Sequence, residues 1–422
     1  MKAYSKYKKS RIEWVGEIPE EWAVHRLKFS AFVNPPKQRV LRDKRKEVSF
    51  LPMESVSVEG DYDKDSVAQY GDVSSGYTYF GNKDVLVAKI TPCFENGKGT
   101  IVDDLVNQMG FGTTEFHVLR SLAHVNPEYL FYFSRTHMFR IIGEAFMQGA
   151  AGQKRITTDF TKSFPMTNPP IDEQIQIARV LRAKLNEINL VIDEDKKLIE
   201  LLKEKRIALI DHAVTKGLDP NIKLKDSGVD WIGQVPATWV VKKLKFVARI
   251  KTGDKNTEDQ QPEGKYPFFV RSQTVERLNT FTFNGEAVLT AGDGVGVGKV
   301  FHYYNGKFDY HQRVYGITNF KEVLGKYAFY YLKNNLIKEM LKYNAKSTVD
   351  SLRLPMFLNF VMTFPVDVDE QKEIIEFLDK ETSKIDRTIN KIEEKINLLE
   401  EYKKSLIHHV VFGKVDVRGV AA

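Results

Sequence analysis

Two stretches of this sequence are close copies of one another: residues 10–22 read SRIEWVGEIPEEW, and residues 227–239 read SGVDWIGQVPATW. The similarity continues a few residues beyond them, because the Leu-Lys-Phe at 27–29 returns at 244–246. The offset between these copies is 217 residues. The chain therefore contains an internal repeat, which has to be recognised before any fold is assigned.

A second pair of copies lies farther along the chain, at a different offset. Phe164-Pro165 and the Asp-Glu-Gln at 172–174 return as Phe364-Pro365 and the Asp-Glu-Gln at 369–371, so the offset is now 197 to 200 residues. Matching flanks around a middle of changed length indicate two similar modules with separately varied interiors. Such an arrangement suits a protein that reads two different things at a fixed separation.

A heptad pattern of apolar side chains follows each Asp-Glu-Gln, over residues 172–214 and 369–412, and no Gly or Pro interrupts it. The acidic pairs favour helix starts, and Gly217 with Pro220 favours a stop after the first helix. Each helix is expected to be about 60 Å long. The first apolar seam consists of Ala178, Leu181, Leu185, Ile188, Ile192, Ile199, Leu202 and Leu209, with Asp195 and Arg206 as polar exceptions. The second consists of Ile375, Leu378, Ile385, Ile389, Ile392, Ile396, Leu399, Leu406 and Val410.

A helix of this length with a narrow apolar seam cannot bury that seam against one compact domain alone. The chain supplies two such helices of matching period, and we expect them to pair antiparallel as a coiled coil. The alternatives are that each helix pairs with another chain, or that the seam is the core face of a bundle.

The regions inside the repeats, roughly 27–165 and 244–365, are rich in short aromatic and β-branched runs punctuated by Gly and Asn. Such runs are typical of strands and tight loops, so we expect two mixed α/β domains. The run 85–89 also corresponds to 288–292, and we expect the two domains to be divergent versions of one fold. The expected strand runs are Asp84–Ala88, Phe111–Leu119, Glu286–Leu289, Val300–Tyr304 and Val314–Ile317.

The composition of the 422 residues, 42% of them apolar, is that of a globular protein with two or three domains. No apolar run reaches the roughly 18 residues that span a bilayer, and no apolar signal core follows the lysines at the N-terminus, so we expect a cytoplasmic protein. The single cysteine, Cys93, excludes an intramolecular disulfide and a multi-cysteine zinc cluster. The nine histidines show no metal-ligand spacing, and we expect no metal site.

The net charge of +7 is compatible with a polyanionic partner, although it is equally common in proteins that have none. The position of the charge is more informative. Clusters such as Gln153-Lys154-Arg155 lie in the unrepeated interiors beside Gly-rich turns, where a binding loop is expected.

Two motifs that suggest an enzyme do not meet their spacing requirements. The glycine-rich run 292–299 has Asp293 and Val300 where a Walker loop needs Gly and Ser or Thr, and it does not fit GxGxxG. We expect a tight turn between strands, whose glycines permit close backbone approach. Asn-Pro-Pro at 34–36 and 168–170 lacks the aromatic residue with which amino-methyltransferases stack a flipped base, so both are expected to be turns. No catalytic Ser, His and acid set can be recognised either.

The whole arrangement resembles the specificity subunit of type I restriction-modification systems. The resemblance covers essentially the full chain and is carried by the paired phrases at 10–22 and 227–239, by residues 88–99 (AKITPCFENGKG), by residues 112–119 (GTTEFHVL), and by the Asp-Glu-Gln opening two long helices. The combination is far more specific than any one phrase.

The resemblance implies a non-catalytic α+β protein with two target-recognition domains, each of which reads one half of a bipartite DNA site. It implies segments at 1–170 (first recognition domain), 171–217 (first spacer helix), 218–367 (second recognition domain) and 368–422 (second spacer helix and tail). The antiparallel helices would set the gap between the half-sites and dock two methyltransferase subunits, and restriction and translocation subunits would join them. S-adenosylmethionine, ATP and Mg would then be bound by those partners, so that the complex is an adenine-N6 methyltransferase and ATP-dependent endonuclease.

The physics of DNA recognition is consistent with this resemblance. Two readers on rigid spacers can enter successive major grooves only if their separation suits about 34 Å or a multiple. Two similar halves can also approximate a two-fold axis and present like docking surfaces to two copies of a partner. The second reader is some 20 residues shorter than the first, and readers so different are expected to recognise an asymmetric target.

Base reading requires donors and acceptors on loops, chiefly Arg, Lys, Asn and Gln, and phosphate contacts require cations or backbone N–H groups. For each candidate the alternative is a solvated or turn-stabilising polar residue. The first reader's candidates are Lys89, Thr91, Asn96, Lys98, Thr113, Thr114, Gln153, Lys154 and Arg155, of which the last three are favoured. The second reader's candidates are Arg271, Ser272, Gln273, Asp293, Lys299, Gln312, Arg313, Lys346, Ser347 and Thr348.

The four tryptophans, Trp14, Trp22, Trp231 and Trp239, lie in the repeated part of the chain. A function common to both halves belongs there, so we expect them to lock each reader to its helix and not to stack on specific bases.

Two rival functions remain open at this point. A self-contained restriction or modification enzyme would need methyl-donor and nuclease motifs, which these residues lack. A coiled-coil scaffold joining two protein-binding domains would have no salt-dependent DNA affinity.

Overall fold

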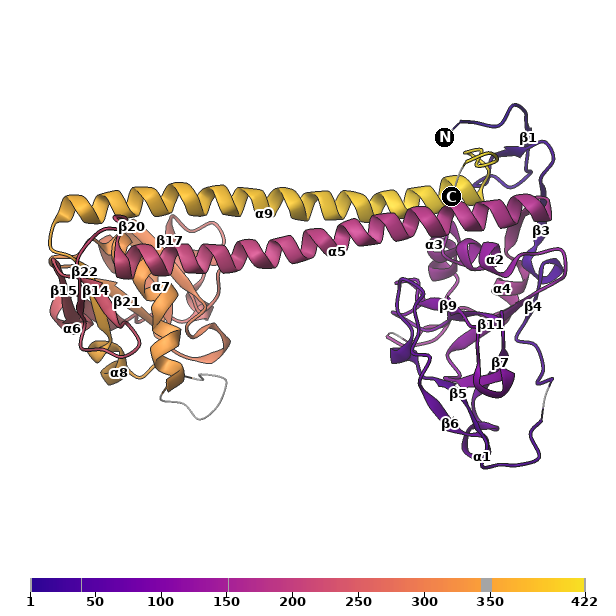
Figure 1. The fold of residues 1–422 in the computed structure, drawn as a ribbon, viewed down its shortest axis with the longest axis horizontal. Coiled ribbons are helices and arrows are strands. Elements are labelled where there is room, and N and C mark those ends of the chain that lie inside the picture. Colours follow the sequence, from indigo (N-terminus) through magenta and orange to yellow (C-terminus); the bar gives the residue numbers. More distant parts are fainter. Residues whose placement is uncertain (1, 39, 151, 343–350, 421–422) are drawn as a thin grey trace. The chain divides into compact units, whose positions relative to one another are not determined.

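The computed structural model describes residues 2–38, 40–150, 152–342 and 351–420. It consists of two compact units, Met1–Glu194 with Glu394–Ala422, and Asp195–Glu393, which we call unit 1 and unit 2. Each long helix contributes one part to each unit, so unit 1 is assembled from two separate stretches of sequence (Figure 1). The domain boundaries expected from the sequence stay a prediction.

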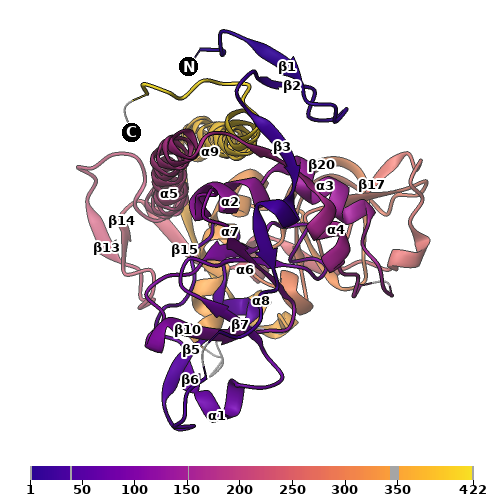
Figure 2. The ribbon, with the colours of Figure 1, turned by 90° about the vertical axis from the view of Figure 1, so that its right-hand side faces the viewer.

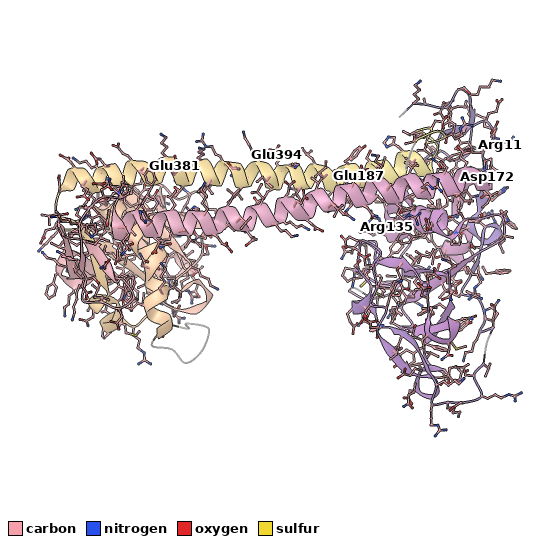
Figure 3. All side chains as sticks on the ribbon, viewed as in Figure 1. Arg11, Arg135, Asp172, Glu187, Glu381 and Glu394 are labelled. Atoms are coloured by element: carbon pink, nitrogen blue, oxygen red, sulfur yellow. The ribbon has the colours of Figure 1, made fainter. Side chains whose placement is uncertain are left out.

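The two long helices are α5 (Ile171–Lys216) and α9 (Val368–Val411). In unit 1, Ile177 and Leu181 of α5 belong to the same buried cluster as Leu406 and Val410 of α9. The start of α5 therefore lies with the end of α9, and Figures 1 and 2 show the two helices side by side there. Figure 3 labels Asp172 at the start of α5 and Glu394, where the unit 1 part of α9 begins.

Unit 2 contains the opposite ends of the same two helices. Val214 near the end of α5 shares a buried cluster with Leu378 near the start of α9. Arg206 Nε lies 3.0 Å from Asp386 Oδ1, so one of the expected polar exceptions forms an ion pair across the helices. Early residues of one helix meet late residues of the other in both units, which confirms the antiparallel pairing.

Most residues of the expected apolar seam are buried, but Leu202, Leu209, Ile396 and Leu399 are only partly buried. Near the end of α5, Ile210, Ala213 and Val214 are buried in place of Leu209. The seam turns at this end because α5 packs against the reader of unit 2, including Trp239, as well as against α9.

Unit 1 contains a four-stranded sheet in the order β4-β11-β8-β9 and a second sheet in the order β6-β5-β10-β7. The expected run Phe111–Leu119 is divided between two strands of different sheets, because residues 113–115 form a turn. The strands are β1 Tyr7–Lys9, β2 Glu17–Pro19, β3 Ala23–Arg26, β4 Ala31–Val33, β5 Glu47–Leu51, β6 Val67–Gln69, β7 Thr78–Gly81, β8 Val85–Ala88, β9 Gly99–Ile101, β10 Met109–Gly112, β11 Phe116–Ser121 and β12 Pro165–Asn168. The short helices are α1 Tyr70–Val73, α2 Pro127–Ser134, α3 His137–Ala145 and α4 Thr158–Ser163.

Unit 2 has one six-stranded sheet in the order β16-β21-β19-β20-β17-β18. Its first four strands match β4-β11-β8-β9 in order, and within each set of four the neighbouring strands are antiparallel, so the readers are versions of one fold. The strands are β13 Leu224–Asp226, β14 Gln234–Pro236, β15 Trp239–Lys243, β16 Arg249–Thr252, β17 Tyr266–Phe269, β18 Val275–Leu278, β19 Phe283–Ala291, β20 Phe301–Tyr310, β21 Val314–Thr318 and β22 Val361–Pro365. The short helices are α6 Leu244–Val247, α7 Gly325–Lys342 and α8 Leu354–Asn359.

The repeated tryptophans join each reader to the start of a long helix. Trp22 Nε1 donates to Glu173 Oε2 at 3.0 Å in unit 1, and Trp239 Nε1 donates to Glu370 Oε1 at 2.8 Å in unit 2. Both carboxylates belong to the acidic pairs that were expected to favour the helix starts. They also accept the hydrogen bonds that join the readers to the helices. The expectation that the tryptophans lock reader to helix is confirmed for these two.

A buried tyrosine makes the corresponding link to the end of the other helix. The Tyr129 hydroxyl lies 3.2 Å from the Val411 carbonyl oxygen of α9, and the Tyr327 hydroxyl lies 3.0 Å from the Val214 carbonyl oxygen of α5. Each reader is thus fixed to the beginning of one helix and to the end of the other.

The glycine-rich run 292–299 is a turn between β19 and β20, as expected. A Cβ at Gly296 would lie 2.6 Å from the Arg271 carbonyl oxygen, and one at Gly298, where φ is +68°, would lie 2.6 Å from Ile337 Cδ1. The glycines permit close approach of this protein's own chain.

Candidate nucleic-acid interface

Three loops of the first reader converge at the end of β8. The Lys89 N–H donates to the Glu115 carbonyl oxygen at 2.9 Å, the Thr91 N–H donates to that of Lys154 at 2.9 Å, and the Ile156 N–H donates to that of Lys89 at 2.9 Å. Candidate residues from three distant stretches of sequence are therefore held together by backbone hydrogen bonds.

The Arg155 guanidinium is held by a neighbouring carboxylate within this site. Its Nε donates to Glu115 Oε2 at 2.8 Å and its Nη2 donates to Glu115 Oε1 at 2.9 Å. Its Nη1 donates to the Gln153 carbonyl oxygen at 2.9 Å. These bonds to Arg155 hold the pKa of the Glu115 carboxyl below its ordinary value, so the carboxylate is charged at neutral pH.

The remaining candidates of the first reader either bond to other parts of the reader or are exposed. Thr91 Oγ1 donates to Glu95 Oε1 at 2.8 Å, and Lys98 Nζ donates to the Met53 carbonyl oxygen at 3.1 Å. Lys89 and Thr113 are half-buried. The exposed candidates are Asn96, Thr114, Gln153 and Lys154.

A cluster of two arginines around one aspartate forms the centre of the second reader's candidate set. Arg271 Nη1 donates to Asp293 Oδ1 at 2.7 Å, and Arg313 Nη1 lies 3.3 Å from Asp293 Oδ2. The pKa of nearby His311 is lowered by burial and by these two cations. The site is therefore electropositive, and it brings together three candidates that are far apart in the sequence.

Three other described candidates of the second reader bond to groups of the same reader. Gln273 Nε2 donates to the Lys299 carbonyl oxygen at 3.2 Å, Ser272 Oγ donates to that of Thr274 at 3.1 Å, and Gln312 is hydrogen-bonded to Asn256. The candidates Lys346, Ser347 and Thr348 lie outside the described residues.

An open cleft of about 530 Å³ adjoins the arginine cluster. Asp293, Arg313, Tyr315 and Arg353 are among the residues that line it. Sequence reasoning missed Tyr315 and Arg353, and it also missed Glu115. The sequence did offer a hint for Glu115, because this acidic residue directly follows the candidates Thr113 and Thr114. Only the fold shows that its carboxylate bonds to Arg155.

A basic loop of the first reader, residues 37–38 and 40–46, was also missed. The Lys44 carbonyl oxygen accepts from the Gly71 N–H at 2.7 Å, and Lys37 Nζ donates to the Ser74 carbonyl oxygen at 2.7 Å, so both ends of the loop are fixed to the region of α1. Arg42, Lys44 and Lys46 are exposed and have no acidic partner among the described residues. The charge run itself was the available signal.

Two features are not found in the described part of the chain. It contains no group of three or more His, Cys, Asp or Glu side chains that could hold a metal ion. None of its helices has the length and apolarity that crossing a membrane requires.

Comparison with protein families finds a match that covers most of unit 2 and the first part of α9. The family model described as the type I restriction modification DNA specificity domain matches residues 236–398. The EcoEI specificity subunit of Escherichia coli is 38% identical over 164 residues, and the EcoAI specificity subunit is 39% identical over 163 residues. The matched segment is 38% of this chain and spans only 27% of the length of either relative.

A more distant relative and two solved structures match nearly the whole chain. The MjaVIII specificity subunit of Methanocaldococcus jannaschii is 22% identical over 96% of this chain and 95% of its own length. A chain from a study of complex assembly and conformational transition of the type I R-M system matches with a TM-score of 0.77 and 16% identity, over 94% of this chain and 99% of that one. The HsdS subunit from Thermoanaerobacter tengcongensis matches with a TM-score of 0.58 and 15% identity, over 94% of this chain and 98% of that one.

The structural matches show the fold, and the sequence matches show similarity over the segment that they cover. Residues 236–398 thus match the type I restriction modification DNA specificity domain, and the resemblance of this chain to the specificity subunits of type I restriction-modification systems is confirmed.

Proposed function

We propose that this chain selects the DNA target of a type I restriction-modification complex, with each reader recognising one half of a bipartite, asymmetric site. The observation that carries the proposal is the contrast between copied and uncopied parts. The Trp22–Glu173 and Trp239–Glu370 bonds are equivalent in the two units, whereas the loops that carry the candidate residues differ. A duplicated frame with different loops suits two readers of different sequences.

The chemistry of the loops supports DNA as the ligand. Both readers carry arginine residues in the loops that hold the candidate residues. Arginine is the side chain that most often reads a base through two parallel hydrogen bonds. The exposed cations of the basic loop suit phosphate oxygens, which supply most of the affinity and none of the sequence information.

The long helices set the gap between the half-sites in this proposal. The helix α5 has 46 residues, and the length of a helix is set by its number of residues. The equivalent surfaces of the two units would each dock one methyltransferase subunit, because a pseudo-two-fold frame presents the same surface twice.

The catalytic work belongs to the partners in this proposal. The methyltransferase subunits would flip an adenine and use S-adenosylmethionine, and restriction subunits would use ATP and Mg. This chain is then a non-catalytic subunit that acts with its partners in the cytoplasm.

A methylation assay with the reconstituted complex tests the function. Methyltransferase subunits with this chain are expected to methylate a defined bipartite motif, and the same subunits without it are not. Genome-wide mapping of methylated adenines in a host that carries the system would give the motif. Unchanged modification in the absence of this chain would remove the proposal.

A further inference from the structure

We propose that each reader recognises guanine through an arginine that a carboxylate holds in place: Arg155 with Glu115 in the first reader, and Arg271 and Arg313 with Asp293 in the second. The inference deepens the proposed function and rests on it. It assigns at least one guanine to each half of the DNA target.

The hydrogen bonds of Arg155 leave two N–H groups in the arrangement that guanine requires. A guanidinium carries five N–H groups, one on Nε and two on each Nη. Glu115 accepts from Nε and from Nη2, and the Gln153 carbonyl oxygen accepts from Nη1. One N–H therefore remains on Nη1 and one on Nη2. Two such groups on one guanidinium match the O6 and N7 acceptors of guanine in the major groove.

The Glu115–Arg155 pair is partly exposed to solvent and not buried. Its side chains are 22% and 41% exposed, whereas those of Asp84 and Arg120, a second bidentate pair of this reader, are 1% and 19% exposed. A partly exposed pair contributes little to stability, so its main effect is to fix the direction of the guanidinium. Fixing that direction in advance lowers the entropy that is lost on binding.

The second reader uses one carboxylate for two arginines. Asp293 engages only Nη1 of Arg271 and only Nη1 of Arg313. The Nε and Nη2 groups of both arginines have no partner among the described residues, and the two side chains are 40% and 55% exposed. Each arginine can therefore present a fork, so this half-site is expected to contain two guanines, on the same strand or on opposite strands.

The position of Asp293 is itself constrained. Its backbone forms an isolated bridge with Ser351, and the adjacent Gly292 N–H donates to the Arg313 carbonyl oxygen at 2.8 Å. The carboxylate and one of its arginines are thus joined through the backbone as well as through their side chains. Asp293 is a positioning residue in this inference, as Glu115 is in the first reader.

The test maps the methylated motif of the complex with wild-type chain and with single variants. Arg155→Ala and Arg155→Lys are both expected to relax one guanine of the first half-site, with the preference for guanine falling about 10- to 100-fold. Lysine keeps the charge but not the planar fork. Arg271→Ala and Arg313→Ala are each expected to relax one guanine of the second half-site and to leave the first half-site unchanged.

The positioning residues and a neighbouring cation provide the controls. Glu115→Gln and Asp293→Asn are expected to relax the same guanines less strongly, because the arginine remains but its direction is no longer fixed. Lys154→Ala removes the exposed cation next to Arg155 and is expected to slow methylation at every site alike. Thermal unfolding of each variant chain separates a loss of specificity from a loss of folding.

The outcomes distinguish this inference from the proposed function. A wild-type motif with no guanine in one half-site overturns the inference for that reader. Uniformly slower methylation with an unrelaxed motif in Arg155→Ala also overturns it, since the arginine would then contact only phosphate. Both results leave the proposed function standing, which fails only if methylation does not depend on this chain.

Discussion

Glu173 is a buried carboxylate that accepts hydrogen bonds from two side chains. Trp22 Nε1 donates to Oε2 at 3.0 Å and the Tyr4 hydroxyl donates to Oε1 at 2.5 Å, while the residue is only 6% exposed. Removing one donor from a buried charged acceptor costs more than the bond contributes. Trp22→Phe is therefore expected to lower the free energy of unfolding by about 1–3 kcal/mol, as measured by denaturant titration.

Trp231→Phe is a matched control for this prediction. The Trp231 ring stacks on Phe360 at 5.8 Å, but its Nε1 has no hydrogen-bond partner in the described part of the chain. Replacement by phenylalanine keeps an aromatic ring there and leaves no carboxylate without a donor. Equal losses in the two variants would show that ring size, not the bond to Glu173, determines the effect.

His117 makes the stability of unit 1 depend on pH. Its Nε2 lies 3.2 Å from the Ile156 carbonyl oxygen, and its Nδ1 lies 3.2 Å from Asn34 Nδ2, which is a donor because Asn34 Oδ1 accepts from the Val118 N–H. The ring is therefore neutral, with the proton on Nε2. Burial lowers the pKa of His117 to about 4.

The sign of the pH effect follows from that lowered pKa. Between an unfolded pKa of about 6.5 and the folded value of about 4, the unfolded chain binds the proton and the folded chain does not. Stability is expected to fall as pH falls through this window, by up to about 1.4 kcal/mol per pH unit from this residue. His408, whose pKa is also lowered to about 4, acts in the same direction. Denaturant titrations at several pH values should show a shallower decline for His117→Gln; an unchanged slope would exclude His117 as the cause.

The cations of the basic loop are expected to account for a measurable share of the salt dependence of DNA binding. Each phosphate that a cation neutralises adds about 0.9 to the slope of log affinity against log salt. Replacing Arg42, Lys44 and Lys46 together by Ala is expected to lower that slope by up to about 2.7. The methylated motif should not change, because phosphate contacts carry no sequence information.

Lys83→Ala is the comparison for the basic loop. Lys83 is an exposed cation of the same unit, but it is already paired with Asp103. Its replacement is expected to leave the salt slope nearly unchanged. A triple variant that behaves like Lys83→Ala would remove the loop from the DNA interface.

The helix α5 predicts that the gap between half-sites can be changed separately from the half-sites themselves. Inserting four residues in its middle adds about 6 Å at the helical rise and keeps the seam close to its period. The unread gap of the methylated motif is expected to lengthen by one or two base pairs, and both half-sites should remain as they were. Changed half-sites with an unchanged gap would contradict the assignment of α5 as the spacer.

At the scale of the whole molecule, the frame could be predicted from the sequence and the reading sites could not. The paired tryptophan phrases and the heptads are local patterns, and they placed α5, α9 and the antiparallel pairing correctly. The contact between Glu115 and Arg155 joins residues that are 40 positions apart in the sequence, and no local spacing rule gives it. The end of the apolar seam of α5 differs from the prediction for a related reason. Ile210 and Val214 pack against the reader of unit 2 as well as against α9, and the heptad pattern does not include the reader.

The two readers also predict the symmetry of the whole target. They have a four-strand order in common, but the first adds a separate sheet and the second extends its sheet by β17 and β18. Surfaces built so differently are expected to recognise unlike sequences. A methylation map that showed an inverted repeat would be inconsistent with this prediction.

The division of the helices between the units has a consequence for biosynthesis. Unit 2 is continuous in sequence, but unit 1 needs residues 394–422 in addition to residues 1–194. At about 5–20 residues per second, the first reader leaves the ribosome tens of seconds before the helix end that covers its seam is made. During that interval Ile177 and Leu181 have no α9 to pack against, so the nascent chain exposes an apolar stripe. Residues 394–422 are therefore translated after the whole of unit 2, although they complete unit 1.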